Sequence, residues 1–183
     1  MDPRTTLQAF DAYLADRYLA LEAVVIGGTA LALLGVIARP TKDCDVLAPP
    51  LSAALRDAAR GFAQQMRTSG QELADDWLNN GPAQLASVLP AGWEGRVQPL
   101  FAGRALQLHT LHRLDLLCSK VFALCDRGLD LADCLALRPT PVELESIREW
   151  LRYQDANPDW PAHVDAVLED IQERLGRGVG RGL

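Results

Sequence analysis

Helical patterning marks the start and the second half of the chain. Leu7, Phe10, Leu14 and Tyr18 recur at helical spacing. Because Thr5-Thr6 ahead of them can serve as an N-cap, the pattern predicts an amphipathic helix over residues 6–19. Later helical patterns cover residues 51–68, 112–126, 130–137, 141–153 and 161–175. The second half of the chain is therefore expected to form mostly a helical bundle.

A strand, a glycine turn and a short helix follow the first helix. The apolar run 23–26 predicts a buried strand, which Gly27-Gly28 ends. Residues 29–34 then predict a helix, closed by Gly35 in the position after its last turn. Polar and apolar residues alternate over 43–47 and predict a second strand.

Two further strand-like segments, 97–101 and 105–111, can pair as a hairpin. Strands alternating with helices, followed by helices alone, indicate an α/β (α+β) protein in which helices flank a small mixed sheet. We expect this α/β core to cover residues 1–111 and a helical region, residues 112–175, to pack on it. The glycine-rich segment 176–183 is expected to be a disordered tail.

Composition and charge narrow the classes of function. A formal charge of −6 argues against broad non-specific binding of duplex nucleic acid, which needs many Lys and Arg contacts to phosphate. No apolar run approaches the roughly 20 residues that span a bilayer, and the N-terminus lacks a basic stretch followed by an apolar one. We therefore expect a cytoplasmic protein without a membrane partner. The four cysteines show no C-x-x-C spacing and are expected to be buried hydrophobes.

The candidate chemistry begins at Asp43 and Asp45. Side chains alternate across a strand, so these two carboxylates share one face while Cys44 points to the other. Like charges at close range need a cation, and oxygen ligands suit Mg²⁺ or Mn²⁺ bound together with nucleotide phosphates. A solvated strand end is the alternative interpretation of an Asp-x-Asp pair.

The glycine pair favours the metal and nucleotide interpretation. Glycine lets backbone N–H groups approach a ligand, and Thr29 begins a helix whose N-terminus favours an anion. The spacing between Gly27-Gly28 and the aspartates can place them side by side on adjacent strands. Arg39, Thr41 and Lys42 give the intervening loop a cationic edge suited to phosphate. A plain tight turn is the alternative for the glycines, and a solvent-exposed turn for the loop.

The signature G-G-x-A-L…G…R-x-T-x-D-x-D of minimal nucleotidyltransferases resembles two stretches of this chain, Gly27-Gly-Thr-Ala-Leu-Ala-Leu-Leu-Gly35 and Arg39-Pro-Thr-Lys-Asp-Cys-Asp-Val-Leu47. More narrowly, the chain is similar to the bacterial DUF6036 and AbiEii-like group, some members of which are toxins of toxin–antitoxin systems. The resemblance implies the nucleotidyltransferase fold. It also implies that the glycines contact triphosphate and that Asp43 and Asp45 hold the catalytic metal.

A second resemblance lies in residues 116–135, which are similar to the K-x-x-A…R…D-x-x-D-L segment of AbiEii-like proteins. It implies catalytic roles for Lys120 and Asp133 and a nucleotide contact for Arg127, which lies two turns from Lys120 on the same helix face. Without the resemblance, Lys120 would be interpreted as a solvated position. Asp130 and Asp133 would then be a helix N-cap and a first-turn acid.

One expected group is missing from the pattern. Polymerase-type nucleotidyltransferases usually add a third carboxylate from a later strand, and neither 97–101 nor 105–111 contains an acid. Two hypotheses follow. The first is a metal-dependent nucleotidyltransferase that uses an NTP and an RNA or protein acceptor, with a cognate antitoxin if it is a toxin. The alternative is a catalytically degenerate protein of the same fold that acts as a nucleotide-binding or interaction module.

Overall fold

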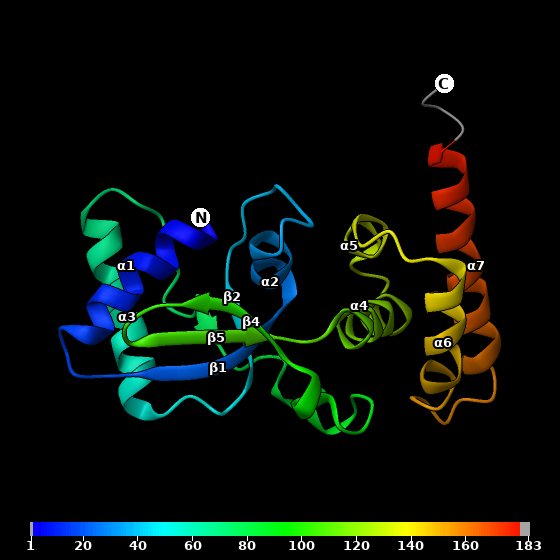
Figure 1. Ribbon diagram of the computed structural model, residues 1–183, viewed down its shortest axis with the longest axis horizontal. Helices are drawn as coiled ribbons and strands as arrows, with labels where there is room; N and C mark the ends of the chain where they lie inside the picture. The colour runs from blue at the N-terminus through cyan, green and yellow to red at the C-terminus, as the bar shows by residue number, and fades with distance from the viewer. Residues whose placement is uncertain (1, 180–183) are drawn as a thin grey trace. The chain divides into compact units, whose positions relative to one another are not determined.

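The computed structural model describes residues 2–179 of the chain, which divide into two units (Figure 1). The sheet unit comprises the residues up to Ser87 together with Gly92–His112. The helical unit comprises Val88–Ala91 and the residues from Arg113 onward. Each unit has its own secondary structure and packing.

The sheet unit contains a mixed sheet, which confirms the predicted α/β class. Its described strands are β1 (Leu21–Ile26), β2 (Cys44–Ala48), β3 (Leu78–Asn79), β4 (Gln98–Ala102) and β5 (Leu106–Thr110). They lie in the order β3-β2-β1-β5-β4. β1 is antiparallel to β2 and parallel to β5, β3 is parallel to β2, and β4 and β5 form the predicted antiparallel hairpin.

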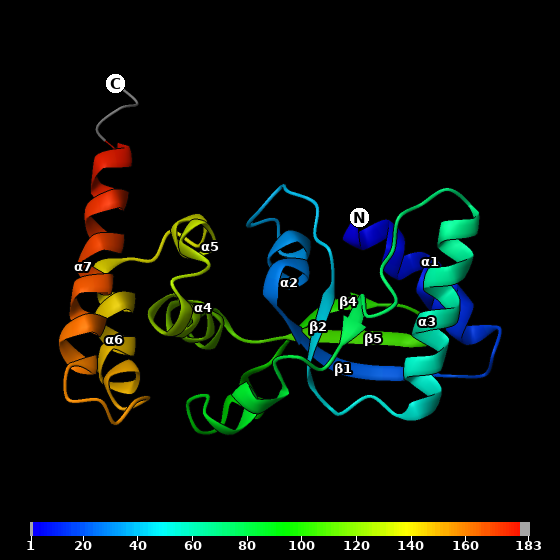
Figure 2. The same ribbon diagram turned by 180° about the vertical axis from the view of Figure 1, so that it is seen from behind.

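Helices α1 (Pro3–Ala15) and α3 (Ala53–Thr68) lie side by side and supply the main hydrophobic core of this unit (Figures 1 and 2). At its centre the ring centroid of Phe10 lies 5.1 Å from that of Phe62 and 5.0 Å from that of Trp77. Cys44 and Val46 of β2 point into the same core. Because side chains alternate along a strand, the Asp45 side chain belongs to the opposite face.

Helix α1 begins and ends earlier than the predicted range 6–19. Asp2, rather than Thr5-Thr6, is the N-cap, because its carboxylate accepts the backbone N–H of Thr5 at 3.1 Å. Pro3 then occupies the first turn, where its missing N–H costs nothing. At the other end Tyr18 has a φ of 54° and is 98% exposed, so it continues neither the helix nor its apolar face.

Asp11 of α1 joins this helix to the turn between β4 and β5. Its carboxylate accepts the backbone N–H groups of Arg104, Ala105 and Leu106 at 3.0, 2.7 and 2.8 Å. Burial alone would raise the pKa of the Asp11 carboxyl, but these three donors outweigh it and hold that pKa below its ordinary value. The carboxylate thus fixes the hairpin against the first helix.

Asp11→Asn is expected to lower the free energy of unfolding by about 2 kcal/mol at neutral pH, because an amide accepts from these donors less strongly than a carboxylate. The folded-state pKa is lowered, so the stabilisation is present above the unfolded pKa of about 4 and is lost as the pH falls through the folded value. Urea unfolding at pH 7 and pH 3 measures both. Asp16→Asn is the control, since that side chain is 75% exposed and lies 4.0 Å from Arg104. Equal effects of the two variants would contradict the assigned role of Asp11.

The helical unit consists, in its described part, of α4 (Arg113–Arg127), α5 (Leu131–Ala136), α6 (Pro141–Arg152) and α7 (Trp160–Val179). A capping box between Thr140 and Glu143 starts α6. Asp165 of α7 accepts hydrogen bonds from Arg148 and Arg152 of α6, at 2.5 Å each, and so ties the two helices together. In residues 2–179, no helix is long and apolar enough to cross a membrane.

The last helix is longer than predicted. It continues through Gly176 to Val179, where the sequence pattern predicted the disordered tail 176–183. An ion pair of 2.9 Å between Arg177 and Glu173, one turn apart, supports this last part of α7. The rest of the predicted tail, 180–183, lies outside the described residues.

Candidate nucleotide and metal site

The glycine turn and Asp45 meet where β1 ends. Ile26, the last residue of β1, lies opposite Asp45 of β2, and helix α2 (Gly27–Leu33) begins at the next residue. Gly27 has a φ of 74°, which favours glycine. A Cβ atom at Gly27 would overlap Oδ2 of Asp45. The backbone of the turn and the carboxylate therefore approach each other as closely as glycine alone permits.

Two buried threonines hold the loop that carries the aspartates. The Thr29 hydroxyl donates to the backbone carbonyl of Asp43 at 2.6 Å and lies 3.0 Å from the Thr41 hydroxyl. Both side chains are at most 4% exposed. The sequence predicts that these threonines contact a nucleotide. Either hydroxyl could do so only in addition to the hydrogen bonds that it already makes. In the structure they fix Asp43 against the start of α2.

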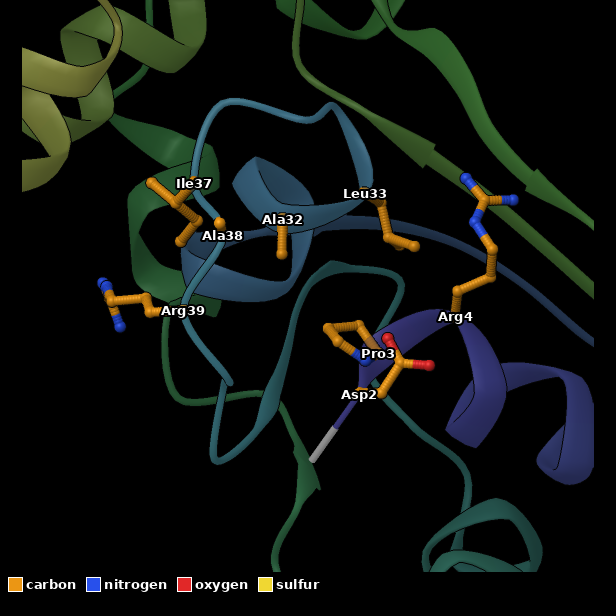
Figure 3. Close-up of a pocket in the computed structure, with 8 residues that line it drawn as sticks. All are labelled: Asp2, Pro3, Arg4, Ala32, Leu33, Ile37, Ala38 and Arg39. Carbon is orange, nitrogen blue, oxygen red and sulfur yellow. The ribbon is translucent and has the colours of Figure 1, made fainter.

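Arg39 lies at the edge of the same turn. A Cβ atom at Gly28 would lie 3.2 Å from Cγ2 of Thr41 and 4.0 Å from Nη1 of Arg39. Arg39 also lines a cavity of about 290 Å³ between α2 and the start of α1, at whose opposite end Arg4 lies (Figure 3). Lys42, like Arg39, is exposed. The predicted cationic loop is therefore present beside Gly28.

Asn79 is a site residue that the sequence analysis missed. It lies opposite Asp45 in the parallel β2–β3 pair, and its Nδ2 donates to Oδ1 of Asp45 at 3.3 Å. Its own Oδ1 accepts the backbone N–H of Gly81 at 2.7 Å. The range 69–82 contains so many turn residues that no strand was predicted there. The apolar pair Trp77-Leu78 directly before the asparagines was the available signal for one.

The divalent metal that the sequence predicts would meet two carboxylates here. Asp43 is exposed directly before β2, and Asp45 is half-buried at the glycine turn. Within residues 2–179, no group of three or more His, Cys, Asp or Glu side chains could hold a metal ion. Carboxylate oxygens are nevertheless the ligands that Mg²⁺ and Mn²⁺ prefer. Two aspartates would leave the other ligand positions of such a cation to phosphate oxygens and water.

The second predicted group lies in the helical unit. Lys120 Nζ donates to Oδ2 of Asp133 at 2.8 Å and to Oδ2 of Asp130 at 3.0 Å. The Lys120 and Asp133 side chains are only 7% and 2% exposed, so the interpretation of Lys120 as a solvated position is wrong. Asp130 occupies the N-cap position of α5 and Asp133 its first turn, as the alternative interpretation predicts, although Asp130 makes no side-chain capping bond. Arg127 ends α4 with a largely exposed side chain that pairs with Asp126 at 3.6 Å.

These contacts define Lys120, Asp130 and Asp133 as an ion cluster within the helical unit, in which Lys120 and Asp133 are buried and Asp130 is 33% exposed. The sheet unit brings together the other predicted site residues that the contacts above connect, and Asn79 joins them. They are Gly27, Gly28, Thr29, Arg39, Thr41, Asp43 and Asp45. Catalytic roles for Lys120 and Asp133, and a nucleotide contact for Arg127, stay predictions.

A protein-family model matches the chain, whereas no curated protein and no solved structure does. The matching family is described as a nucleotidyltransferase of unknown function, DUF6036, and its model covers residues 5–137. That range includes the sheet, the glycine turn, both aspartates and the Lys120 segment. It spans well over half of the chain and agrees with the mixed sheet flanked by helices. The chain therefore belongs to the DUF6036 family of nucleotidyltransferases.

Proposed function

We propose that this protein is a metal-dependent nucleotidyltransferase that moves a nucleotidyl group from an NTP to a hydroxyl of RNA or protein. The observation that carries the proposal is the packing of the Asp45 carboxylate against Gly27. A metal-binding acid and a backbone turn able to approach phosphate thereby form one site, on the sheet face opposite α1 and α3. Membership of a nucleotidyltransferase family supports the reaction class.

Each group in the site has a defined task in this proposal. Asp43 and Asp45 hold Mg²⁺ or Mn²⁺, which supplies charge neutralisation at the triphosphate. The backbone of Gly27-Gly28 lies against the phosphates, because a glycine turn lets a ligand approach its N–H groups closely. Arg39 and Lys42 add positive charge from the loop. Thr29 keeps Asp43 in place through its carbonyl hydrogen bond.

The proposed reaction is a single displacement at phosphorus. The acceptor hydroxyl oxygen forms a bond to the α-phosphorus, and the bond from that phosphorus to the bridging oxygen of the β-phosphate breaks. Pyrophosphate leaves with the electron pair of that bond, and the hydroxyl proton is released to solvent. Positioning and charge compensation therefore account for the contribution of the chain's own residues.

Transfer of an α-labelled nucleotide tests the proposal. Each of the four NTPs is incubated with the protein, Mg²⁺ or Mn²⁺, and either total RNA or a protein lysate. We expect the wild type to label one acceptor class, and the Asp43→Ala/Asp45→Ala variant to lose about a hundredfold or more of this activity. The matched control is Asp16→Ala/Asp57→Ala, which removes two largely exposed carboxylates of the same unit and should label as the wild type does.

The outcomes separate the candidate functions. If the wild type neither transfers label nor binds any NTP, the nucleotidyltransferase proposal is wrong. Binding without transfer would instead favour the alternative, a degenerate member that acts as a nucleotide-binding or interaction module. The same double variant tests a toxin role, which the AbiEii-like resemblance supports. Expression of the wild type alone should then arrest growth, and co-expression of a neighbouring antitoxin gene should relieve the arrest.

A further inference from the structure

The geometry points to Asn79 as the positioning residue of Asp45 and as the neutral third member of the metal site. This inference rests on the proposed function for its metal, and on the contacts of the sheet unit for its geometry. Asn79 lies directly opposite Asp45 on the neighbouring strand. A third carboxylate supplied by β3 would occupy the position of Asn79.

The Asn79 amide is fixed at both ends. Its oxygen accepts the Gly81 N–H at 2.7 Å, which leaves the NH₂ group to face Oδ1 of Asp45 at 3.3 Å. A Cβ atom at Gly81 would lie only 2.8 Å from the same amide oxygen, so the turn closes tightly over it. The orientation of the amide is therefore set by the backbone, and a donor is presented to the carboxylate.

This contact divides the two oxygens of Asp45 between two tasks. Oδ1 receives the Asn79 amide, whereas Oδ2 is the oxygen nearest to the glycine turn. A carboxylate held at one oxygen presents the other in a fixed direction, toward the place where the proposal puts phosphate and cation. Fixing a ligand in this way is what a supporting residue around a metal site does.

The neutrality of the amide has its own consequence. An aspartate in place of Asn79 would set a third negative charge beside Asp45, which is unfavourable unless a cation compensates. With asparagine the site carries the charge of two carboxylates and matches one divalent cation. The protein thus holds Asp45 in place without metal and binds a single cation together with its nucleotide.

Asn80 shows that this role is not a general property of the turn. Its amide donates to the carbonyls of Val46 and Pro49 at 3.0 and 3.1 Å and accepts the Leu51 N–H at 2.7 Å. All three partners are backbone groups, so Asn80 holds the chain and Asn79 holds a functional side chain.

The test compares Asn79→Ala and Asn79→Asp with the wild type by calorimetric titration of Mn²⁺, with and without a non-hydrolysable NTP. Asn79→Ala should weaken Mn²⁺ binding about tenfold or more. Asn79→Asp should bind Mn²⁺ more tightly than the wild type, melt at a lower temperature in EDTA, and gain more in melting temperature from Mn²⁺. Gln64→Glu, which adds the same charge at an exposed position of α3, should change none of these. Binding by Asn79→Asp no tighter than by Gln64→Glu would overturn the inference.

A measurement in EDTA keeps this inference separate from the proposed function. Asn79→Ala, Asp45→Asn and the double variant are compared by their urea midpoints. If Asn79 orients Asp45, the midpoint change of the double variant differs from the sum of the single changes. Additive changes would refute the positioning role whatever the metal result. If the changes are non-additive but the wild type binds no Mn²⁺, the Asn79–Asp45 contact is upheld and the metal-dependent function is refuted.

Discussion

Gly27→Ala is expected to reduce nucleotidyl transfer about a hundredfold or more, because a displacement of the reacting groups by about 1 Å has an effect of this size. The new Cβ atom would overlap Oδ2 of Asp45, so either the carboxylate or the turn must move. The backbone φ of 74° adds a strain of about 1 kcal/mol for any residue other than glycine. Steady-state transfer of label from the preferred NTP measures the loss, and circular dichroism verifies that the variant is folded.

Gly35→Ala is the matched control for this prediction. Gly35 has nearly the same φ, 72°, and follows the same helix, but a Cβ atom there would meet nothing within 4 Å. It should therefore show the backbone strain without the loss of activity. If Gly27→Ala and Gly35→Ala retain the same activity, the Gly27-Gly28 pair is a plain tight turn and the proposed phosphate contact is wrong.

Lys120→Met is expected to lower the free energy of unfolding of the helical unit by about 3–5 kcal/mol, since it leaves a buried carboxylate without its cation. Asp133 is 2% exposed, and Lys120 Nζ is its partner at 2.8 Å. The double variant Lys120→Met/Asp133→Leu should recover most of the loss, because apolar residues can replace a buried ion pair at little cost. Urea unfolding followed by tryptophan fluorescence measures the series.

The control for Lys120 is Arg127→Ala, on the same helix. Arg127 is largely exposed and its ion pair with Asp126 spans 3.6 Å, so we expect a change within about 0.5 kcal/mol. A different outcome for Lys120→Met would support the catalytic role that the sequence predicts for this lysine. If Lys120→Met abolishes nucleotidyl transfer while its stability matches that of the wild type, the lysine acts in the reaction and its burial between two acids is secondary.

Local signals made much of the sheet unit predictable. The glycine pair after an apolar run gave the strand, turn and helix, and the alternation around Cys44 gave β2 with its acids on one face. Signals of this kind act over a few residues, which is the range that sequence patterns describe. The start of α1 was predicted less well, because Thr5-Thr6 are also capping residues and drew the prediction away from Asp2, the stronger cap that the helix uses.

Contacts between distant segments were beyond the reach of the sequence. Asn79 and Asp45 are 34 residues apart, and their hydrogen bond depends on an edge strand of two residues. The acids beside Lys120 were visible as a motif, but the burial of Asp133 with the lysine was not. Strand order and the choice of hydrogen-bond partners depend on packing across the whole unit. The pair Asp43 and Asp45 could therefore be predicted from the sequence, whereas Asn79, which supports Asp45, could not.

Because β3 is short, the site is sensitive to a shift in the register between β2 and β3. β2 and β3 pair through only two residue pairs, Cys44 with Leu78 and Asp45 with Asn79. A shift by one residue would turn every β3 side chain to the other face and set an apolar or misplaced group beside Asp45. The three backbone contacts of Asn80 and the hydrogen bond from Trp77 Nε1 to the Ala59 carbonyl resist that shift. Substitutions of Trp77 or Asn80 can therefore abolish activity by misaligning Asn79 with Asp45 while the fold persists.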